Sequence, residues 1–234
     1  MPIPLLQPLG ALLPDWCPPP PPPHTLLQGH GCRLEPVDAA RHAQPLFDAF
    51  AEDPDGALWT YLPYGPFADA TALAAWLDSK RGLSDQQLYA IVDAASGAAL
   101  GLCGYLRIQP EAGSIEVGNL TYSPRLQRSR LATAAMALMM ENAFALGYRR
   151  YEWKCNALNA PSCRAAERLG FTFEGIFRQA TVVKGRNRDT AWYSILDHEW
   201  PRLRDAYARW LAPDNFDEAG RQRHALSTRT GRAP

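Results

Sequence analysis

The 234-residue sequence lacks the cysteine patterns of disulfide-stabilised and zinc-binding proteins. A disulfide framework or a structural zinc site needs cysteines that are paired at short, regular spacings. This chain has an odd number of cysteines with no Cys-x-x-Cys pair: Cys17, Cys32, Cys103, Cys155 and Cys163. The sequence therefore predicts reduced thiols and no metal site.

Long apolar runs and an excess of either charge are also missing. No segment approaches the roughly 20 apolar residues that span a bilayer, and six prolines occupy positions 18–23, where a signal peptide would have its apolar segment. The 24 basic and 24 acidic residues cancel, so no overall field would attract nucleic acid or an anionic membrane. We expect a cytoplasmic protein that binds neither, and any anion site must be local.

The composition predicts one domain between two tails. A length of 234 residues with 47% hydrophobic content supports a single sizeable core. Residues 1–31 form a proline-rich arm, expected as an extended polyproline II rod. The arm either binds an aromatic groove of a partner or, as its flanking leucines favour, packs on its own domain or a neighbouring subunit. Residues 32–212 form the domain, as a monomer or a homodimer, and the polar tail of residues 213–234 is expected to be poorly ordered.

Hydrophobic periodicity predicts an α/β (α+β) domain. A first edge strand begins at Cys32, and Asp38 and Asp69 are good N-caps for the two helices that follow it. Alternating residues then predict a three-stranded meander, followed by helix, strand, helix, a hairpin with its turn at residues 185–188, and an amphipathic helix over residues 200–211. The expected result is a mixed, mostly antiparallel sheet of about seven strands with helices on its faces.

Positive charge gathers where the meander gives way to a helix. Residues 115–122 alternate as a strand, Pro124 ends it, and residues 132–146 repeat apolar side chains at helical spacing. Between these two elements lie three arginines: Arg125, Arg128 and Arg130. The unpaired N–H groups and the dipole of a helix start favour an anion, and nearby guanidinium groups strengthen that preference. The turn therefore predicts a diphosphate-binding site.

Two motifs in this half of the chain resemble those of the GCN5-related N-acetyltransferase (GNAT) family. Residues 127–132, Gln-Arg-Ser-Arg-Leu-Ala, are similar to the Q/R-x-x-G-x-G/A motif whose backbone amides hold the pyrophosphate of acetyl-coenzyme A, although Arg130 replaces the first glycine. Asn159-Ala160-Pro161-Ser162, followed by Leu169-Gly170-Phe171, resembles the family's N-x-x-S/A and L-G-F segment and has the residues of a well-capped helix. From about Cys32 to Leu211 the chain resembles the RimJ/RimL branch, whose members acetylate ribosomal-protein N-termini or small amines.

This resemblance implies a fold, a donor and a set of coenzyme-binding residues. The sheet would be splayed into a V between its fourth and fifth strands, and acetyl-coenzyme A would be the donor, with no metal. A strand that has lost its neighbour leaves backbone N–H groups free for the acetyl carbonyl and the pantetheine amides. The residues implied to contact the coenzyme are Leu120, Thr121, Tyr122, Gln127, Arg128, Ser129, Arg130, Leu131, Ala132, Thr133, Asn159 and Ser162.

Acetyl transfer also needs a base for the ammonium group and a proton for the departing thiolate. Glu116, on the strand that enters the site, is the expected base, unless the amine loses its proton to water alone. Many members of the family have a tyrosine as general acid where this chain has Ala166, so Ser162 is the expected replacement. An acyl-enzyme on Cys155 or Cys163 would lack a histidine nearby in the sequence.

The loop between the first two helices is unusually aromatic and is expected to face the acceptor. Trp59, Tyr61 and Tyr64, together with Glu116, would bind a primary amine such as a peptide N-terminus or a small cationic metabolite. Otherwise these aromatic side chains pack in the core, and the acceptor site lies along the C-terminal hairpin around Lys184 to Arg188. The sequence thus predicts an acetyl-coenzyme A-dependent N-acetyltransferase that works by direct transfer in a ternary complex. The alternatives are a coenzyme-binding protein without activity and a transferase for longer acyl groups.

Overall fold

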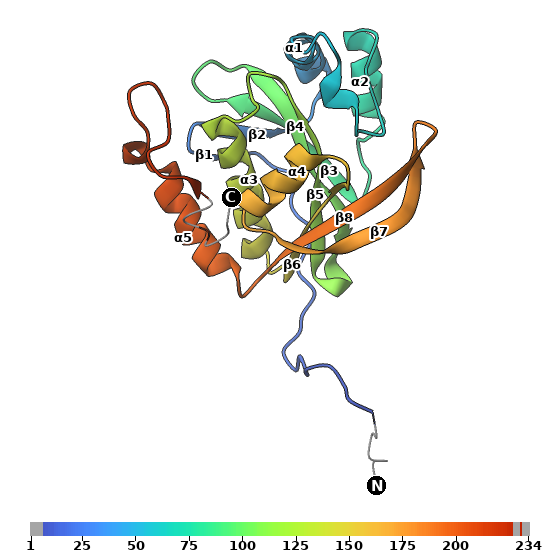
Figure 1. Ribbon diagram of the computed structural model, residues 1–234, viewed down its shortest axis with the longest axis vertical. Coiled ribbons are helices and arrows are strands. Elements are labelled where there is room, and N and C mark those ends of the chain that lie inside the picture. The colour runs from blue at the N-terminus through green and yellow to red at the C-terminus, as the bar shows by residue number, and fades with distance from the viewer. Residues whose placement is uncertain (1–6, 227–229, 231–234) are drawn as a thin grey trace.

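The computed structural model describes residues 7–226 and Thr230. These residues contain an eight-stranded sheet and five α-helices (Figure 1). The strands are β1 (Leu27–Gly29), β2 (Cys32–Pro36), β3 (Gln86–Asp93), β4 (Ala99–Gln109), β5 (Ser114–Tyr122), β6 (Arg150–Asn156), β7 (Thr172–Val183) and β8 (Arg186–Leu196). The helices are α1 (Ala39–Phe50), α2 (Ala70–Asp78), α3 (Arg130–Ala145), α4 (Ala160–Arg168) and α5 (Trp200–Leu211). None of these helices is long and apolar enough to cross a membrane.

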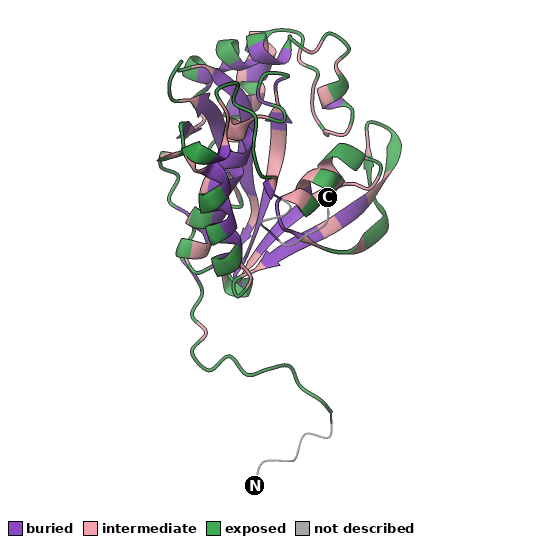
Figure 2. Cartoon of the chain, turned by 60° about the vertical axis from the view of Figure 1, so that its left-hand side comes forward, coloured by how far each residue is buried: buried purple, intermediate pink, exposed green. Residues whose placement is uncertain are grey.

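The order of the strands is β1-β2-β3-β4-β5-β6-β8-β7, and all neighbours are antiparallel except β5 and β6. These two parallel strands pair only from Ser114 with Arg150 to Val117 with Trp153. Beyond that point each strand keeps its other neighbour while the two halves of the sheet separate, which gives the V seen in Figure 2. The predicted fold class is confirmed, and the split falls between the fourth and fifth strands counted from Cys32.

Strand β1 corrects the predicted edge of the sheet. His30 and Gly31, both with positive φ (53° and 76°), form a two-residue turn that pairs β1 with β2. Positive φ at both positions is the geometry of a type I′ turn, whose twist suits a hairpin. Cys32 therefore begins an inner strand and not the expected edge strand, and the sheet has eight strands where about seven were predicted.

Helices cover both faces of the sheet, and each face has its own hydrophobic core. Helix α3 lies on one face, where Tyr105 and Ile115 are fully buried. On the other face, α1 and α2 bury Leu46 and Leu73 against β3 and β4. Full burial of one such aliphatic side chain contributes about 1.5–3 kcal/mol. The half of the sheet that contains β2 to β5 is thus packed against helices on both faces, and the V opens at its β5 side.

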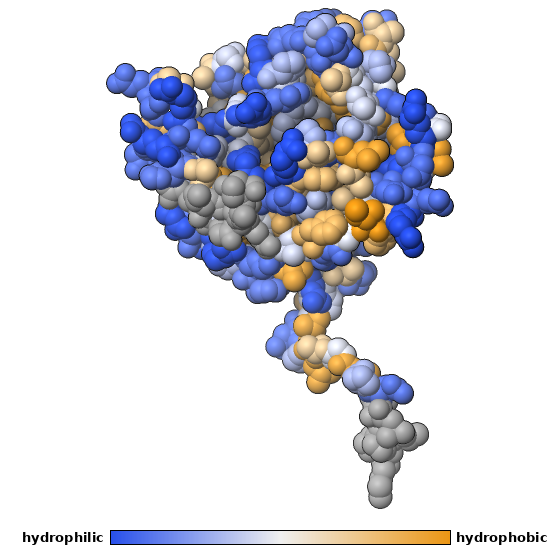
Figure 3. All heavy atoms as spheres, viewed as in Figure 1, coloured by the Kyte–Doolittle hydropathy of each residue, from blue (hydrophilic) through white to orange (hydrophobic). Residues whose placement is uncertain are grey.

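The proline-rich arm lies along its own domain with a period of three residues. Trp16 is partly buried beneath Arg149, whose Cζ lies 5.6 Å from the ring centre, and Pro19 and Pro22 are buried, while the residues between them are exposed. A polyproline II helix has about three residues per turn, so one edge of the rod faces the domain. Gln87 Nε2 donates a hydrogen bond to Pro22 O (2.6 Å). Of the expected alternatives, the structure shows packing on the chain's own domain, and the described residues before Trp16 (7–15) project from it (Figure 3).

The C-terminal tail packs on α5 as far as Leu226, whereas the sequence predicted poor order. Phe216 lies edge-on to Trp210 with their ring centres 5.1 Å apart, and Trp210 Nε1 donates to Gln222 Oε1 (2.9 Å). Leu226 is buried in the hydrophobic core to which α3 and α5 also contribute side chains. Phe216 and Leu226 therefore hold the otherwise polar tail against the domain. Residues 227–229 and 231–234 lie outside the described part of the chain.

Candidate active site

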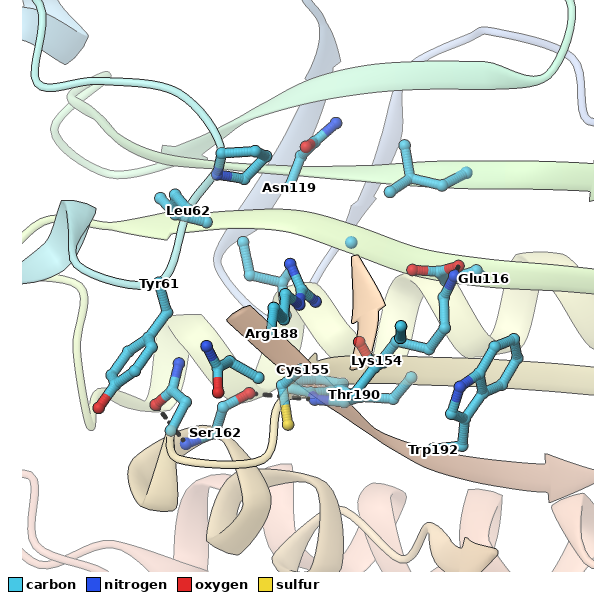
Figure 4. A pocket seen from close by; sticks show the side chains of 18 of the residues that line it. Tyr61, Leu62, Glu116, Asn119, Lys154, Cys155, Ser162, Arg188, Thr190 and Trp192 are labelled. Carbon is cyan, nitrogen blue, oxygen red and sulfur yellow. Dashed lines mark hydrogen bonds and ion pairs between the residues drawn. The ribbon is translucent and has the colours of Figure 1, made fainter. Parts of the chain in front are cut away.

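A pocket of about 500 Å³ lies in the V between β5 and β6 (Figure 4). Its walls come from these two strands, the β7–β8 hairpin, the loop after α1 and the start of α4. Five residues predicted for the site line it: Tyr61, Glu116, Leu120, Asn159 and Ser162. The other predicted residues lie outside its lining. Among residues 7–226, no group of three or more His, Cys, Asp or Glu side chains is placed to hold a metal ion.

A β-bulge interrupts β5 beside this pocket. Leu102 of β4 pairs with Thr121 and Gly104 pairs with Gly118, so two residues of β5 face a single residue of β4. Asn119 has a positive φ of 52° there, a conformation that asparagine adopts more readily than most residues. Asn119 lines the pocket and was missed by the sequence analysis. A glycine followed by asparagine inside a predicted strand was a usable signal for the bulge.

Glu116 is buried, and two cations contact one of its carboxylate oxygens. Its Oε2 lies 2.6 Å from Arg107 Nε and 2.9 Å from Lys154 Nζ. Both cations also lie over the Trp192 ring, each 4.6 Å from its centre, and Arg107 forms a second ion pair with Glu152. The predicted base is therefore part of an ion-pair network that joins β4, β5 and β6.

Asn159 and Ser162 reach the pocket at the start of α4. The Asn159 side chain accepts a hydrogen bond from Ser162 N (3.2 Å), which is the N-cap contact that the sequence predicted. The Ser162 hydroxyl accepts a second hydrogen bond from Trp153 Nε1 (3.1 Å). This contact uses a lone pair of the oxygen, so the hydroxyl proton is left for Cys155 or for a group in the pocket.

Cys155 also lines the pocket, but its thiol is poorly suited to act as a nucleophile. Burial raises the pKa of Cys155 to about 12, although a hydrogen bond from Ser162 acts in the opposite direction. Its Sγ lies 3.6 Å from Cys163 Sγ. Because the thiolate is the nucleophilic form, a thiol with so high a pKa is inert at neutral pH. This disfavours an acyl-cysteine route, in agreement with the sequence analysis.

We expect the Cys155→Ala variant to keep most of the wild-type kcat, because the direct transfer that the sequence predicts needs no thiolate on the enzyme. Intact-mass measurement after incubation with acetyl-coenzyme A should show no acetyl adduct on the wild-type chain. Cys163→Ala is the matched control, since it removes the neighbouring thiol without changing the lining of the pocket. An acetylated Cys155, or a loss of activity in the Cys155 variant alone, would contradict direct transfer.

The turn before α3 presents backbone donors as the sequence predicted. Ser129 is the N-cap, and its hydroxyl accepts a hydrogen bond from Ala132 N (3.0 Å). The N–H groups of Arg130 and Leu131, in the first turn of the helix, have no acceptor within the helix. The positive end of the helix dipole lies at the same place. This turn therefore retains the backbone features that favour an anion.

Only one of the three arginines in this turn has a side chain without a partner in the described part of the chain. Arg125 Nε is paired with Glu52 Oε1 (2.8 Å). Arg130 is directed toward the end of α5, where it donates to Leu211 O. Arg128 is exposed and its side chain makes no hydrogen bond or ion pair with the described residues. Of the three guanidinium groups predicted to favour an anion, only that of Arg128 is thus free to do so. Arg130 occupies the glycine position of the family motif, but its side chain points away from the turn, toward the end of α5.

Other residues predicted to bind the coenzyme have contacts within the protein. Gln127 Nε2 donates to Tyr122 O (2.9 Å), which joins the turn to the end of β5. Thr133 is buried, and its Oγ1 accepts a hydrogen bond from Arg168 Nη2 (3.0 Å). Their contact with a coenzyme stays a prediction.

The aromatic loop divides between the core and the pocket. Trp59 is buried and lies edge-on to neighbouring aromatic rings in the core that α1 and α2 form. Tyr64 packs on the same core, and its hydroxyl shares a hydrogen bond with Thr121 Oγ1 (3.0 Å). Tyr61 lines the pocket and donates to Leu158 O (3.1 Å). Trp59 and Tyr64 therefore pack in the core, which was the alternative expected from the sequence. Of the three aromatic residues, only Tyr61 lies where it could contact an acceptor substrate.

The β7–β8 hairpin extends over the pocket and contacts this loop. Its turn is at Lys184 and Gly185, which both have positive φ (48° and 72°), and not at the predicted residues 185–188. Lys184 Nζ donates a hydrogen bond to Trp59 O (2.9 Å). Because the turn comes earlier, Arg188 is a residue of β8 and lines the pocket.

A sheet that splits around a pocket, with an anion-favouring helix start next to the split strand, is the arrangement that the sequence predicted for an acyltransferase. The chain belongs to the GNAT family, because the acetyltransferase (GNAT) domain family matches residues 32–172, which is more than half of the chain. Members of this family bind acetyl-coenzyme A.

Three solved structures show how far this similarity extends. A GCN5-related N-acetyltransferase from Brucella melitensis is 46% identical, with a TM-score of 0.91, over 94% of this chain and 100% of its own. A GNAT-family protein from Chromobacterium violaceum ATCC 12472 is 45% identical, with a TM-score of 0.78, over 85% of this chain and 100% of its own. RimJ from Mycobacterium smegmatis, in complex with CoA-disulfide, is 21% identical with a TM-score of 0.63 over 75% of this chain and 87% of its own. The likeness to RimJ shows a shared fold.

Proposed function

We propose that the chain transfers the acetyl group of acetyl-coenzyme A to a primary amine by direct attack in a ternary complex. The observation that carries this proposal is the pocket in the V, which has polar groups on two different sides. The start of α4 borders one side, and the ion-pair network of Glu116 borders the other. Such a pocket suits a reaction in which two substrates meet.

Strand β6 separates the two sides of the pocket. Trp153 contacts Ser162 of α4, whereas the next residue, Lys154, lies over Trp192 of β8. Successive side chains of a strand point to opposite faces, so the α4 side and the Trp192 side are opposite faces of the sheet. We infer that the donor binds on the α4 side and the acceptor on the Trp192 side.

The donor side fits acetyl-coenzyme A. Beyond Val117 the backbone of β5 no longer pairs with β6, which supports the predicted contacts of its peptide groups with the thioester and the pantetheine arm. The exposed Arg128 and the first N–H groups of α3 suit the diphosphate. Asn159 lines the pocket with an amide that suits the peptide-like groups of the pantetheine arm.

The chemistry that we propose uses two side chains of the pocket. The amine nitrogen attacks the carbonyl carbon of the thioester, and the C–S bond breaks. Glu116 first takes a proton from the ammonium group, directly or through water, so that the attacking nitrogen is neutral. Ser162 gives its proton to the departing thiolate, and the second proton that the nitrogen loses restores the Ser162 hydroxyl through water. Glu116 is the only carboxylate in the lining of this pocket as described. Its Oε2 is shared by two cations, so Oε1 is the oxygen left for the amine.

Arg128→Ala should weaken the binding of coenzyme A by about tenfold or more, because a charge-assisted contact to phosphate contributes about 1.5–3 kcal/mol. Isothermal titration calorimetry with coenzyme A measures this directly. Arg125→Ala is the matched control: it removes a guanidinium from the same turn that is already paired with Glu52, and it should change the affinity much less. Equal affinities for the wild-type chain and the Arg128 variant would place the diphosphate elsewhere.

The proposed function is tested by following free thiol while a panel of primary amines is added to the chain with acetyl-coenzyme A. Thiol release that depends on the amine supports acetyl transfer. Binding of coenzyme A without thiol release would indicate a coenzyme-binding protein without activity. Faster thiol release from a longer acyl-coenzyme A than from acetyl-coenzyme A would indicate that the chain transfers a longer acyl group to the same class of amine.

A further inference from the structure

The face of the sheet that borders the acceptor side carries more positive than negative charge. Arg107, Lys154 and Arg188 lie on this face, and the first two contact Trp192. Glu116 binds both Arg107 and Lys154, and Glu152 adds a second acidic partner for Arg107. Arg188 has no acidic partner in the described part of the chain. The excess charge of the pocket is therefore located at Arg188.

Arg188 and Trp192 also present unused hydrogen-bond donors. Both line the pocket and are partly buried, and Arg188 Nε and Trp192 Nε1 are shielded from solvent without an acceptor. They lie an even number of residues apart on β8, so their side chains share one face of the strand. Figure 4 shows Arg188 in the middle of the pocket, with Tyr61 on one side and Lys154 on the other. Shielded donors without acceptors are destabilising, which favours a ligand that brings oxygen atoms to this place.

We propose that Arg188 binds a carboxylate of the acceptor, so that the acceptor is a small amine that also carries a carboxylate group, such as an amino acid. This inference rests on the proposed function. The planar guanidinium can hold a carboxylate through two parallel N–H···O hydrogen bonds, which fixes orientation as well as position. Glu116 and Arg188 then bind the ammonium end and the carboxylate end of the same molecule and turn its nitrogen toward the thioester.

This acceptor differs from the small cationic metabolite, which was one of the two kinds of acceptor expected from the sequence. That expectation rested on the aromatic loop, which has no lysine or arginine. In the structure, Tyr61 of this loop lines the pocket. The positively charged side chains of the pocket belong to other elements, Lys154 to β6 and Arg188 to β8. A second positive charge on the amine would lie among these cations and would be repelled.

The test compares the wild-type chain with Arg188→Gln and with the matched control Arg186→Gln. Arg186 is the exposed first residue of β8 and lies outside the pocket lining. Each protein is given saturating acetyl-coenzyme A with L-amino acids or with the corresponding amino-acid amides, which lack only the carboxylate, and kcat/KM is measured from free thiol. Binding of coenzyme A is measured by calorimetry in parallel.

We expect the wild-type chain and Arg186→Gln to prefer the amino acid to its amide by about tenfold or more. Arg188→Gln should lose this preference, with little change for the amides and none in the affinity for coenzyme A. Equal kcat/KM for acids and amides in the wild-type chain would overturn the inference and leave the proposed function standing. Weaker coenzyme binding by Arg188→Gln would also overturn it, since the residue would then serve the donor.

A second measurement needs no turnover. N-acetyl-amino acids and N-acetyl-amino-acid amides are titrated into protein saturated with coenzyme A. The acids should bind more tightly to the wild-type chain and equally to Arg188→Gln. If no amine releases thiol but this difference in binding is found, the proposed function fails while the carboxylate site stands. The absence of any such difference overturns the carboxylate site.

Discussion

Replacing Ser162 by alanine is expected to lower kcat by about 10²–10⁴-fold while the affinity for coenzyme A stays nearly unchanged, because general acid catalysis typically contributes that much. The hydroxyl lines the pocket and accepts a hydrogen bond from Trp153 Nε1 (3.1 Å), which orients its proton away from the indole. The helix cap survives the change, since Asn159 binds the backbone N–H of residue 162. Steady-state kinetics and calorimetry with coenzyme A separate the two quantities.

Trp153→Phe is the control for this prediction. It removes the hydrogen bond that orients the hydroxyl and keeps the hydroxyl itself, so kcat should fall by less than in Ser162→Ala. Small and equal effects of Ser162→Ala on kcat and KM would leave Ser162 with a structural role, and the thiolate would then take its proton from water.

Trp59→Ala is expected to cost about 3–5 kcal/mol of the free energy of unfolding, as for other large aromatic side chains removed from a core. Trp59 is buried against the Phe50 and Phe67 rings, whose centres lie 5.4 and 5.5 Å from its own. Urea unfolding followed by circular dichroism measures the change.

Tyr61→Ala is the matched change in the same loop. Tyr61 lines the pocket, and its hydroxyl makes one exposed hydrogen bond, to Leu158 O. We expect little loss of stability and a higher KM for the amine, with unchanged affinity for the donor. A stable Trp59→Ala protein with a selective rise in the amine KM would reverse these assignments and return Trp59 to the acceptor site.

Local signals in the sequence were sufficient for most helices and strands. Asp38, Asp69, Ser129 and Asn159 all accept the hydrogen bonds of N-caps, and each precedes a helix. These features depend on a few neighbouring residues, and so they can be read from a single sequence. Strand β1 was missed because it has only three residues, next to a proline run that argues against a strand.

The site was harder to predict because its contacts depend on strand register. Glu116 was recognised from its own strand, but Arg107 and Lys154 reach it from β4 and β6, far apart in the sequence. Arg188 was assigned to a turn, and a shift of the turn to residues 184 and 185 moved it into a strand and a pocket wall. No periodicity distinguishes Trp59 from Tyr61 in an irregular loop, so only the packing separates the core residue from the one in the pocket.

The fit of the arm restricts how its length can vary between related chains. Trp16, Pro19 and Pro22 meet the domain because they lie on one edge of a rod with about three residues per turn. Inserting a single proline between Trp16 and Pro19 would rotate the indole by about 120° around the rod and turn it away from Arg149. Inserting a whole turn would keep the indole facing the domain and move it by about 9 Å. Among relatives that retain this tryptophan, proline tracts should therefore differ in length by multiples of about three.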